Sequence, residues 1–531
     1  MFPLMPMQRR SAARRLPGAG LLIPALLGGA LLWGGCRAGG VASGAATVAA
    51  QQHWPVPPAP ALQTSNPVLL VALAARLGPA AGVPPAEATP LELRAASGQL
   101  LLEDAVGHRA TASQLALVWR RVPLSAPLRI HRRVLGPFPS FESAEEAARA
   151  WKTRGASVSI ARPGDWEVWA APEAPDPPGR PARRVERLET TRLVLELSQP
   201  GGGVPLQTPI RLQAPGGLLW GNARYSGPFL LQPDAYGSWS LVEQVPLERY
   251  LQGVVPMEIG AGAPAAALAA QAVLARTWAV RNRIRFQIDG YHLCADTQCQ
   301  VYGDPGAASE AVRQAITASR AKVLASGGEP IRAVYHASNG GIGAGFDEVW
   351  AASPLPYLRA FADGPSGFTA RFAVPLAPPA LQALLSGEAP AAWGADHPLY
   401  RWQRLLTAEQ IRSALATAGG GVGSPTALRV LERGPSGRAV ALEIQGSAGV
   451  RVLRLDAIRR TLRQLPSTLF IVTPAGPGTW LVRGGGFGHG AGMSQAGAID
   501  LARQGWNTDR ILLHYYPGSA LVPLRSFGEA L

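Results

Sequence analysis

The sequence is poor in lysine and in charged residues as a whole. Only Lys152 and Lys322 are lysines among the 50 basic residues of this 531-residue chain. The arginines form no dense basic run beyond the first 15 residues, and no basic patch is interleaved with aromatic residues, so nothing supports nucleic-acid binding. The net charge of +15 would suit another anionic polymer. Charged residues make up 16% and hydrophobic ones 47%, which excludes a largely disordered chain.

Two common catalytic motifs are missing. No Gly-x-x-x-x-Gly-Lys-Ser/Thr run occurs, which argues against a phosphate-binding loop, and the lack of a His-Glu-x-x-His helix argues against a zinc peptidase of that type. Cysteine is scarce as well, since only Cys36, Cys294 and Cys299 occur. By contrast, 49 prolines and 61 glycines predict many loops and linkers, and the length predicts two or three domains.

Residues 1–36 predict an export signal or a lipoprotein leader. Four arginines precede a 13-residue apolar stretch over 21–33, which is short for a membrane span of about 20 residues. Cys36 follows two glycines, as at a lipoprotein site, although Trp33 stands where such sites usually carry leucine. An uncleaved anchor is the alternative. Under each interpretation, the bulk of the chain is exported and only this N-terminal segment contacts the membrane.

Composition shifts divide the rest of the chain. Residues 37–66 are rich in Ala, Gly, Gln and Pro and predict a flexible tether. Residues 67–170 predict a small α+β domain, and the Pro-rich run 171–190 predicts a hinge before a larger domain over 191–525.

One segment of the small domain has a clear element order. Within 128–172, the run "RRVLGPFPSFESAEEAARAWKTRGASVSI" predicts a strand, a helix from Ala144 capped by Ser143 and ended by Gly155, and a second strand. The segment resembles the sporulation-related repeat (SPOR) domain, which binds the glycan strands of peptidoglycan. A generic strand-helix-strand unit accounts for the same pattern.

The larger domain is expected to be strand-rich with one long helix. Segments such as "RLVLELS", "IRLQA" and "GSWSLVEQVPL" alternate and are separated by Gly and Pro, which is typical of strands. The Ala-rich run that follows predicts a helix from about Pro264 to Arg283, because Ala favours helix and Pro suits a first turn. The predicted fold class is mixed α+β and multi-domain, with this Ala-rich helix beside a cleft of the strand-rich larger domain.

Nine ordered sequence blocks point to one family. They are "VPLERYLQGVVPMEIG", "ALAAQAVLARTWA", "CQVYGD", "AVYHASNGG", "EVW", "PYLRAFADG", "LPSTLF", "GFGHGAGMSQAGA" and "ILLHYYPG". In order and spacing they resemble the stage II sporulation protein D family, also called the SpoIID/LytB domain, over roughly 190–520. The resemblance implies an exported lytic transglycosylase of the periplasm or cell wall. Such an enzyme cuts peptidoglycan glycan between N-acetylmuramic acid and N-acetylglucosamine, with a preference in sporulation members for strands without stem peptides.

The resemblance places the catalytic acid at Glu258, in "VPMEI", where the family has Val-Pro-x-Glu-Met. A glycoside hydrolase generally needs two carboxyl groups. A lytic transglycosylase can use one, because the C6 hydroxyl of muramic acid attacks and the same carboxyl group takes back the proton. Val255, Met257 and Ile259 are expected to form an apolar shell that raises the pKa of Glu258. Favourable placement of a glutamate near a helix N-terminus is the simpler alternative.

The predicted substrate-binding residues come from the other blocks. Glycines 484–492 would bring backbone amides close to a sugar ring, beside side chains that contact hydroxyl or N-acetyl groups. The predicted binding set is Gln271, Arg276, His336, Ser338, His489, Ser494, Gln495 and Tyr515. One position departs from the family, because Ala269 stands where members often carry lysine.

The block around "YHLCADTQCQVYGD" is compatible with three states of its cysteines. His292, Cys294 and Cys299 could bind zinc with an open fourth position, as some relatives bind zinc in this segment, although Gln298 replaces the expected histidine. The two cysteines could instead form a disulfide or remain as free thiols. The predicted chemistry itself requires no cofactor.

Two rival functions remain. A non-catalytic protein of the cell envelope could bind peptidoglycan glycan strands through the same cleft, and the missing lysine at position 269 favours it. A zinc metallohydrolase acting on peptide bonds is less favoured, because its helix motif is absent.

Overall fold

The first half of the chain forms two large β-sheets. The structure is a computed structural model that describes residues 51–179, 181–198, 202–387 and 391–531, so the predicted leader lies outside the described residues. The first sheet has the spatial order β15 (Leu293–Cys294), β1 (Val68–Leu77), β14 (Trp239–Pro246), β13 (Phe229–Pro233), β10 (Ile210–Gln213), β3 (Leu100–Glu103) and β4 (Arg109–Ala112). All its pairings are antiparallel except that of β1 with β15.

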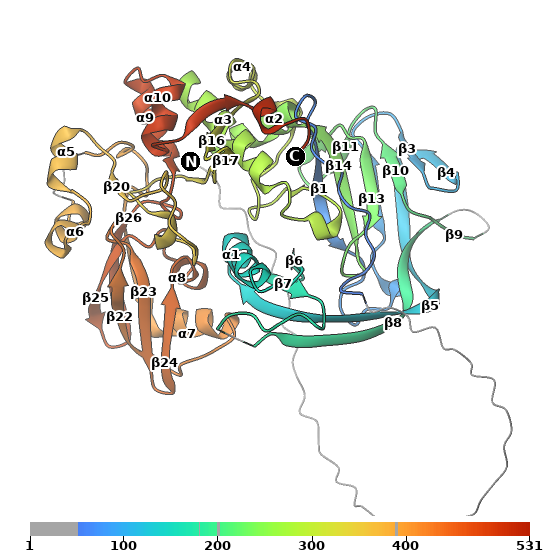
Figure 1. The fold of residues 1–531 in the computed structure, drawn as a ribbon, viewed down its shortest axis with the longest axis horizontal. Helices are drawn as coiled ribbons and strands as arrows, with labels where there is room; N and C mark the ends of the chain where they lie inside the picture. The colour runs from blue at the N-terminus through green and yellow to red at the C-terminus, as the bar shows by residue number, and fades with distance from the viewer. Residues whose placement is uncertain (1–50, 180, 199–201, 388–390) are drawn as a thin grey trace, which may run out of the picture. The chain divides into compact units, whose positions relative to one another are not determined.

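The second sheet is built around two long antiparallel strands (Figure 1). Its order is β12 (Ala223–Tyr225), β11 (Leu218–Trp220), β2 (Leu91–Ala95), β5 (Gln114–Phe138), β7 (Trp166–Ala170) and β6 (Val158–Ala161), and β8 (Arg183–Leu197) pairs with β5 and with β9 (Val204–Pro205). Helix α1 (Phe141–Lys152) packs on β7 through the buried side chains of Phe141 and Trp151. Ser140 caps this helix by accepting a hydrogen bond from the backbone N–H of Ser143, so the predicted cap at Ser143 is wrong by three residues.

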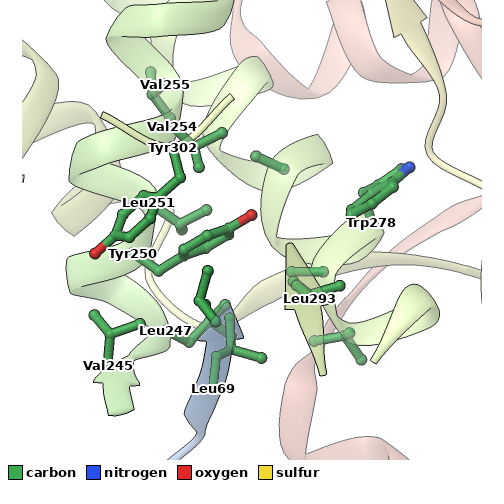
Figure 2. Packing of buried hydrophobic residues seen from close by; sticks show 14 of the residues in the cluster. Leu69, Val245, Leu247, Tyr250, Leu251, Val254, Val255, Trp278, Leu293 and Tyr302 are labelled. Atoms are coloured by element: carbon green, nitrogen blue, oxygen red, sulfur yellow. The ribbon is translucent and has the colours of Figure 1, made fainter. Parts of the chain in front are cut away.

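Two helices lie at the centre of the main core. Helix α2 (Leu247–Glu258) follows β14 directly, and α3 (Ala265–Asn282) matches the Ala-rich helix expected from Pro264 onwards. Small alanine side chains let neighbouring elements approach α3 on every side, and nearly all of its residues are buried. Figure 2 shows Tyr250, Leu251 and Val254 of α2 among the buried residues of this core.

Short elements complete the wall of the core around α3. They are α4 (Glu310–Ala318), the sheet β17 (Glu329–Pro330), β16 (Lys322–Ser326) and β28 (Ala520–Pro523), the parallel pair β18 (Tyr335–His336) and β27 (Met493–Ser494), the pair β19 (Ile342–Gly343) and β20 (Phe361–Ala362), and helices α9 (Gln495–Arg503) and α10 (Thr508–Tyr515). Five 3₁₀ turns are also described: Pro85–Glu87, Gln287–Asp289, Pro305–Ala307, Phe346–Glu348 and Leu524–Phe527.

An inserted lobe interrupts this wall between β20 and β27. It contains α5 (Ser366–Arg371), α6 (Pro378–Leu385), β21 (Arg401–Thr407), α7 (Ala408–Thr417), β22 (Pro425–Arg433), β23 (Ala439–Gly446), β24 (Gly449–Arg454), α8 (Ala457–Thr461), β25 (Phe470–Gly476) and β26 (Thr479–Gly485). Its strands form two three-stranded sheets, and two hydrophobic clusters of its own fill it. The nine ordered sequence blocks did not predict that this lobe has a hydrophobic core of its own.

The predicted tether and hinge differ from the structure. Backbone N–H groups of Leu62 and Thr64 donate to the C-terminal residues Leu531 and Glu529, so this part of 37–66 is held on the body. Residues 183–190 of the predicted hinge belong to β8, which pairs with β5 over most of its length. In the sheet, ladder hydrogen bonds between strands satisfy the backbone polar groups of these residues in place of water.

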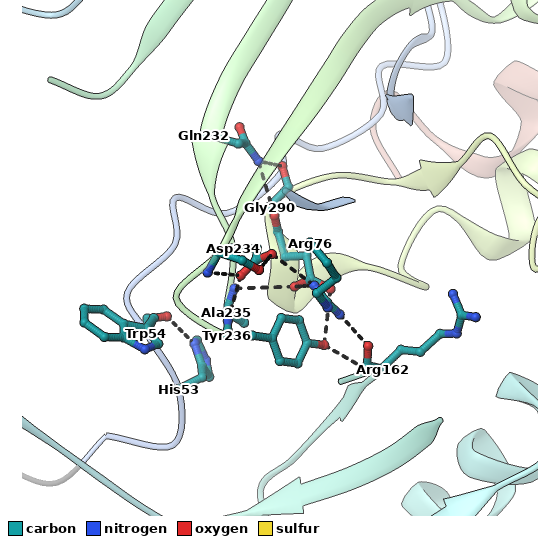
Figure 3. A network of polar contacts seen from close by, with 11 residues as sticks. His53, Trp54, Arg76, Arg162, Gln232, Asp234, Ala235, Tyr236 and Gly290 are labelled. Atoms are coloured by element: carbon teal, nitrogen blue, oxygen red, sulfur yellow. Dashed lines mark hydrogen bonds and ion pairs between the residues drawn. The ribbon is translucent and has the colours of Figure 1, made fainter. Parts of the chain in front are cut away.

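A buried polar network also ties the two large sheets together (Figure 3). Arg76 of β1 donates to the carboxylate of Asp234 at 3.1 Å and to the carbonyl oxygen of Arg162. The N–H of Arg162 in turn donates to the Tyr236 hydroxyl at 2.7 Å. Residues 67–170 therefore share sheets and polar contacts with the following residues, and the described residues from Gln51 to Leu531 form one structural unit.

The predicted fold class is confirmed, because helices and strands are mixed throughout the described residues in several sheets and separate cores. Among the described residues, no helix combines the length and apolar character that crossing a membrane requires.

Candidate active site

Glu258 opens onto a cavity of about 260 Å³ at the C-terminal end of α2. The cavity walls come from five parts of the chain. They are the start of α1 (Ser140, Phe141, Glu142), the end of α3 and the turn after it (Trp278, Arg285), the disulfide loop (Thr297, Gln298, Cys299, Val301), the strand β18 region (Val334, Tyr335, Trp350) and the inserted lobe with its return (Arg460, His489). Aromatic and polar side chains thus surround one carboxyl group.

Burial raises the pKa of Glu258 to about 7. Hydrogen bonds from the Val301 backbone N–H, at 3.0 Å to Oε1, and from the Tyr335 side chain oppose this shift without cancelling it. The expected apolar shell of sequence neighbours is only partly present, because the Met257 side chain is 47% exposed. On a helix adjacent residues point in different directions, so residues far away in sequence desolvate Glu258 instead.

The loop "CQVYGD" holds Glu258 in place. The side-chain amide of Gln300 donates to the Tyr250 hydroxyl and to the Ala275 carbonyl, each at 3.3 Å, and its oxygen accepts from the Tyr335 hydroxyl at 2.8 Å. The one proton of the Tyr335 hydroxyl therefore has two acceptors within reach, the Gln300 oxygen and the Glu258 carboxylate. Sequence reasoning missed Gln300 and Tyr335, although both stand in motifs that it had singled out.

His489 lines the cavity, and His336 lies beside it. The ring centroids are 5.2 Å apart, and that of Trp350 is 5.0 Å from the centroid of His489. Burial lowers the pKa of His489 to about 4 and that of His336 well below its usual value. The nearby buried guanidinium of Arg438 acts in the same direction. Both rings are therefore neutral at pH 7 and cannot compete with Glu258 as acids.

The glycines of "RGGGFGHGAGM" serve close packing. Gly490 has φ +90°, and a Cβ there would overlap the Arg438 guanidinium. Gly488 has φ +108° and lies against the Cβ of His336. The Gly488 N–H donates to the Pro466 carbonyl at 3.0 Å, so this amide is already used within the protein. These two glycines let the inserted lobe approach the core, a role different from the predicted contact with sugar.

Two predicted binding residues on α3 lie outside the cavity. Gln271 is buried and accepts a hydrogen bond from the side chain of Gln495 at 3.2 Å. Arg276 is buried too, where it forms a two-point ion pair with Glu248 at 2.7 and 2.9 Å. Both sites join elements of the core, so these polar side chains are satisfied largely by the protein itself.

The remaining predicted binding residues also lie away from the cavity. Ser494 caps α9 by accepting from the Gly497 N–H, and the Ser338 hydroxyl accepts from the Gly340 N–H. The Tyr515 hydroxyl donates at 3.0 Å to the buried carboxylate of Asp363. The structure thus brings Glu258, His489 and the neighbouring His336 together, and it places the rest of the predicted residues in the scaffold around them.

Cys294 and Cys299 form a disulfide, one of the three states that the sequence allowed. Both ring nitrogens of His292 are engaged, one with the backbone N–H of Leu70 and one with the Pro60 carbonyl, each at 2.9 Å. Among the described residues, no group of three or more His, Cys, Asp and Glu side chains could hold a metal ion. The possible zinc set is therefore corrected to a disulfide, which closes the turn 294–299 directly before Gln300 and Val301.

Helix α1 supplies an unexpected wall of the cavity. Glu142 lines it and accepts from the Arg285 guanidinium at 2.6 Å, with both side chains nearly buried. Arg285 holds the pKa of Glu142 below its usual value despite burial. The cavity therefore contains two carboxyl groups of opposite behaviour, since Glu258 favours its protonated form and Glu142 its ionised form.

Fold and site together define an α+β protein whose cavity presents a carboxyl group able to keep its proton near neutral pH. Residues 235–325 match the family model described as Stage II sporulation protein, which covers α2, α3 and the disulfide loop. Residues 344–492 match a family described as a domain of unknown function (DUF8618), and this range contains the inserted lobe.

Individual relatives agree with the first match. The chain is 28% identical over 301 residues to Stage II sporulation protein D of Bacillus subtilis (strain 168), covering 54% of this chain and 77% of the relative. Identity and coverage are the same for the protein of that name from Bacillus amyloliquefaciens. The chain is also 28% identical over 294 residues to the Amidase enhancer of Bacillus subtilis (strain 168), covering 51% of this chain and 40% of that relative. Over about half of its length the chain is thus similar to the stage II sporulation protein D (SpoIID) family.

Proposed function

We propose that this protein is an exported lytic transglycosylase that cleaves peptidoglycan glycan between N-acetylmuramic acid and N-acetylglucosamine. The observation that carries the proposal is the Glu258 carboxyl group, whose pKa of about 7 keeps a large protonated fraction at neutral pH inside a cavity. A general acid works best with a pKa near the operating pH. The disulfide supports export, because such bonds persist outside the reducing cytoplasm.

The proposed reaction needs one proton donor and no water. Protonated Glu258 gives its proton to the oxygen that bridges the two sugars, and the bond from this oxygen to C1 of N-acetylmuramic acid breaks. The C6 hydroxyl of the same muramic acid then bonds to C1, and its proton returns to the Glu258 carboxylate. The products are a shortened strand that begins with free N-acetylglucosamine and a strand that ends in 1,6-anhydro-N-acetylmuramic acid.

Neighbouring groups support each stage of this proton cycle. The Val301 N–H stabilises the carboxylate that forms after proton transfer, while burial favours the protonated form that begins the cycle. The hydrogen bond from the Tyr335 hydroxyl likewise favours the carboxylate. Glu258 can therefore exist in both states without a large change in its surroundings.

The test is product analysis on peptide-free glycan strands. Wild-type protein should release anhydromuramyl ends, detected by mass, and Glu258→Gln should release none. Glu310→Gln makes the same chemical change at an exposed glutamate of α4 and should leave the products unchanged. Equal product release by the Glu258→Gln and wild-type proteins would contradict the proposed acid.

The second carboxylate makes the type of product informative. If Glu142 activated water, as in an inverting hydrolase, the products would end in reducing N-acetylmuramic acid and take up labelled oxygen from water. Glu142 is already engaged by Arg285, which favours a structural role. We therefore expect anhydro ends, with no label incorporated, from wild type.

A non-catalytic role in binding peptidoglycan is the second candidate, favoured by the similarity to a relative named Amidase enhancer. In this role the protein would bind glycan strands and release no product of either kind. Binding that persists in wild type together with the absence of all cleavage products would select this role over catalysis.

A further inference from the structure

A second cavity adjoins the first on the far side of Ser140 and Trp350. Both residues line both cavities, so the two spaces meet at this pair. The second cavity, here called the α1 chamber, lies between helix α1 and the segments 349–351 and 454–457. The first cavity alone, at about 260 Å³, falls below the roughly 300–1,000 Å³ of typical ligand pockets. The α1 chamber adds about 410 Å³.

We propose that the α1 chamber binds further sugar residues of the glycan strand whose scissile bond lies at Glu258. The proposal rests on the function given above, because continuity with the Glu258 cavity identifies the occupant. A polysaccharide cut within its length must leave the reaction site in at least one direction, and the chamber offers such a path. Helix α1 would then determine how many sugar residues of the strand the protein binds.

The lining of the α1 chamber suits pyranose rings. Ala147 and Ala150 face it from α1, and Ala351 and Ala457 face it from the opposite side, so short side chains leave width for a sugar. Phe138 and Trp350 add aromatic surface, on which the apolar faces of sugars pack. Small and aromatic residues are thus combined along a single continuous path.

Arg454 gives this path a charged side that matches the polymer. Its side chain is 65% exposed and pairs with Glu432 at 3.4 Å. Because an exposed pair of this kind contributes little, the Arg454 guanidinium can exchange its partner for a carboxylate on the glycan. N-acetylmuramic acid carries such a carboxylate on its lactyl group when no peptide is attached, and a guanidinium binds carboxylates well.

Buried ion pairs keep α1 in position as a chamber wall. Glu142 pairs with Arg285 at 2.6 Å, and Glu145 pairs with Arg332 at 2.6 Å. All four side chains are at most 15% exposed, and removing one member of such a pair leaves a buried charge alone. The wall is therefore a fixed part of the structure.

Filling the chamber tests the proposal without touching the acid. Ala147→Trp would place a large ring in the α1 chamber, and Lys152→Trp would place the same ring on the exposed end of the same helix. Both changes are made in the Glu258→Gln protein, which stops turnover. Affinity for peptide-free glycan of two and of six sugars is measured by titration calorimetry, with circular dichroism to verify folding.

We expect Ala147→Trp to weaken binding of the six-sugar strand about tenfold and to leave binding of the two-sugar unit unchanged. The Lys152→Trp protein should bind both the two-sugar and the six-sugar glycan with the affinity of the Glu258→Gln parent. Arg454→Ala, an exposed change that does not endanger folding, should also weaken only the longer strand. The proposal is overturned if the Ala147→Trp and Arg454→Ala proteins bind six sugars as the parent does.

The same measurements separate this proposal from the proposed reaction. If the parent binds six sugars more tightly than two and Ala147→Trp removes this difference, the proposal for the α1 chamber is supported. This holds even if the wild-type protein releases no cleavage product. The proposal for the α1 chamber would be overturned if no protein, including the Glu258→Gln parent, bound the six-sugar strand. If wild type cleaves glycan but neither chamber substitution changes binding of the six-sugar strand, the proposed reaction is unaffected. Only the proposal that the α1 chamber binds sugars is then contradicted.

Discussion

Replacing Glu258 by glutamine should stabilise the protein at alkaline pH while it abolishes cleavage. The folded protein raises the pKa of Glu258 from 4.5 to about 7, so the folded state binds this proton more tightly than the unfolded chain. The free energy of unfolding therefore falls as the pH rises from about 4.5 to about 7. At ~1.4 kcal/mol per pKa unit, the loss at pH 8 is on the order of 3 kcal/mol.

Glutamine is neutral at every pH and keeps an oxygen that can accept from the Val301 N–H. Urea unfolding of wild type and Glu258→Gln at pH 4, 5, 6, 7 and 8 measures the difference. We expect similar stabilities at pH 4, then a growing advantage for Glu258→Gln that levels off above pH 7, at about 3 kcal/mol. The gain would show that the folded protein maintains this carboxyl group at a cost in stability, as catalytic sites often do.

Glu142→Gln is the matched control, with the opposite sign. Arg285 lowers the pKa of Glu142, so its ionised form stabilises the fold above the unfolded pKa, and this contribution is lost as pH falls through the folded value. Glu142→Gln should therefore be less stable than wild type at pH 7, with the deficit shrinking in acid. A stability difference between wild type and Glu258→Gln that stays constant from pH 4 to 8 would refute the reasoning.

The same contacts give three more expected outcomes. Cleavage by wild type should decline with an apparent pKa of about 7 as Glu258 ionises, so initial rates from pH 5 to 9 that stay flat would contradict its role as acid. Changing both Cys294 and Cys299 to alanine should lower the free energy of unfolding by about 2 kcal/mol, because the bond closes a short loop, and should slow cleavage. A thermal melt and the cleavage assay measure both effects, and unchanged values would exclude this role. Arg276→Ala should cost about 3–5 kcal/mol by leaving the part-buried Glu248 unpaired. Because Arg276 lies outside the cavity, glycan affinity of the folded protein should not change, and a specific loss of affinity would restore its predicted binding role.

The sequence was most predictive where the signal is local. An alanine-rich run opening with Pro264 predicted a helix to Arg283, and the structure has one over Ala265–Asn282, because helix propensity and end signals act within a few residues. Glu258 was singled out from its motif by the family resemblance. The motif did not reveal the cause of its raised pKa, because that cause is burial in the folded chain, which the hydrogen bonds from Val301 and Tyr335 only partly oppose.

Polar residues in the family-like blocks were less reliable guides to the cavity. Arg276, Ser494 and Tyr515 have the donor groups that a sugar site needs, yet each is bonded to a partner in the core. A sequence shows which side chains can form hydrogen bonds but not which of them are already satisfied. Only burial and the partner atom decide between a structural and a binding role.

The amino-acid sequence alone predicted the α+β class and the central helix from patterns of neighbouring residues, and a family resemblance singled out Glu258 as the candidate acid. The tertiary structure decided what surrounds that acid. Glu142 meets Arg285 across 143 residues of chain, and through this contact helix α1 becomes a wall of the cavity. No periodicity specifies such a contact, since it depends on how separately formed sheets and helices pack their buried charges against one another.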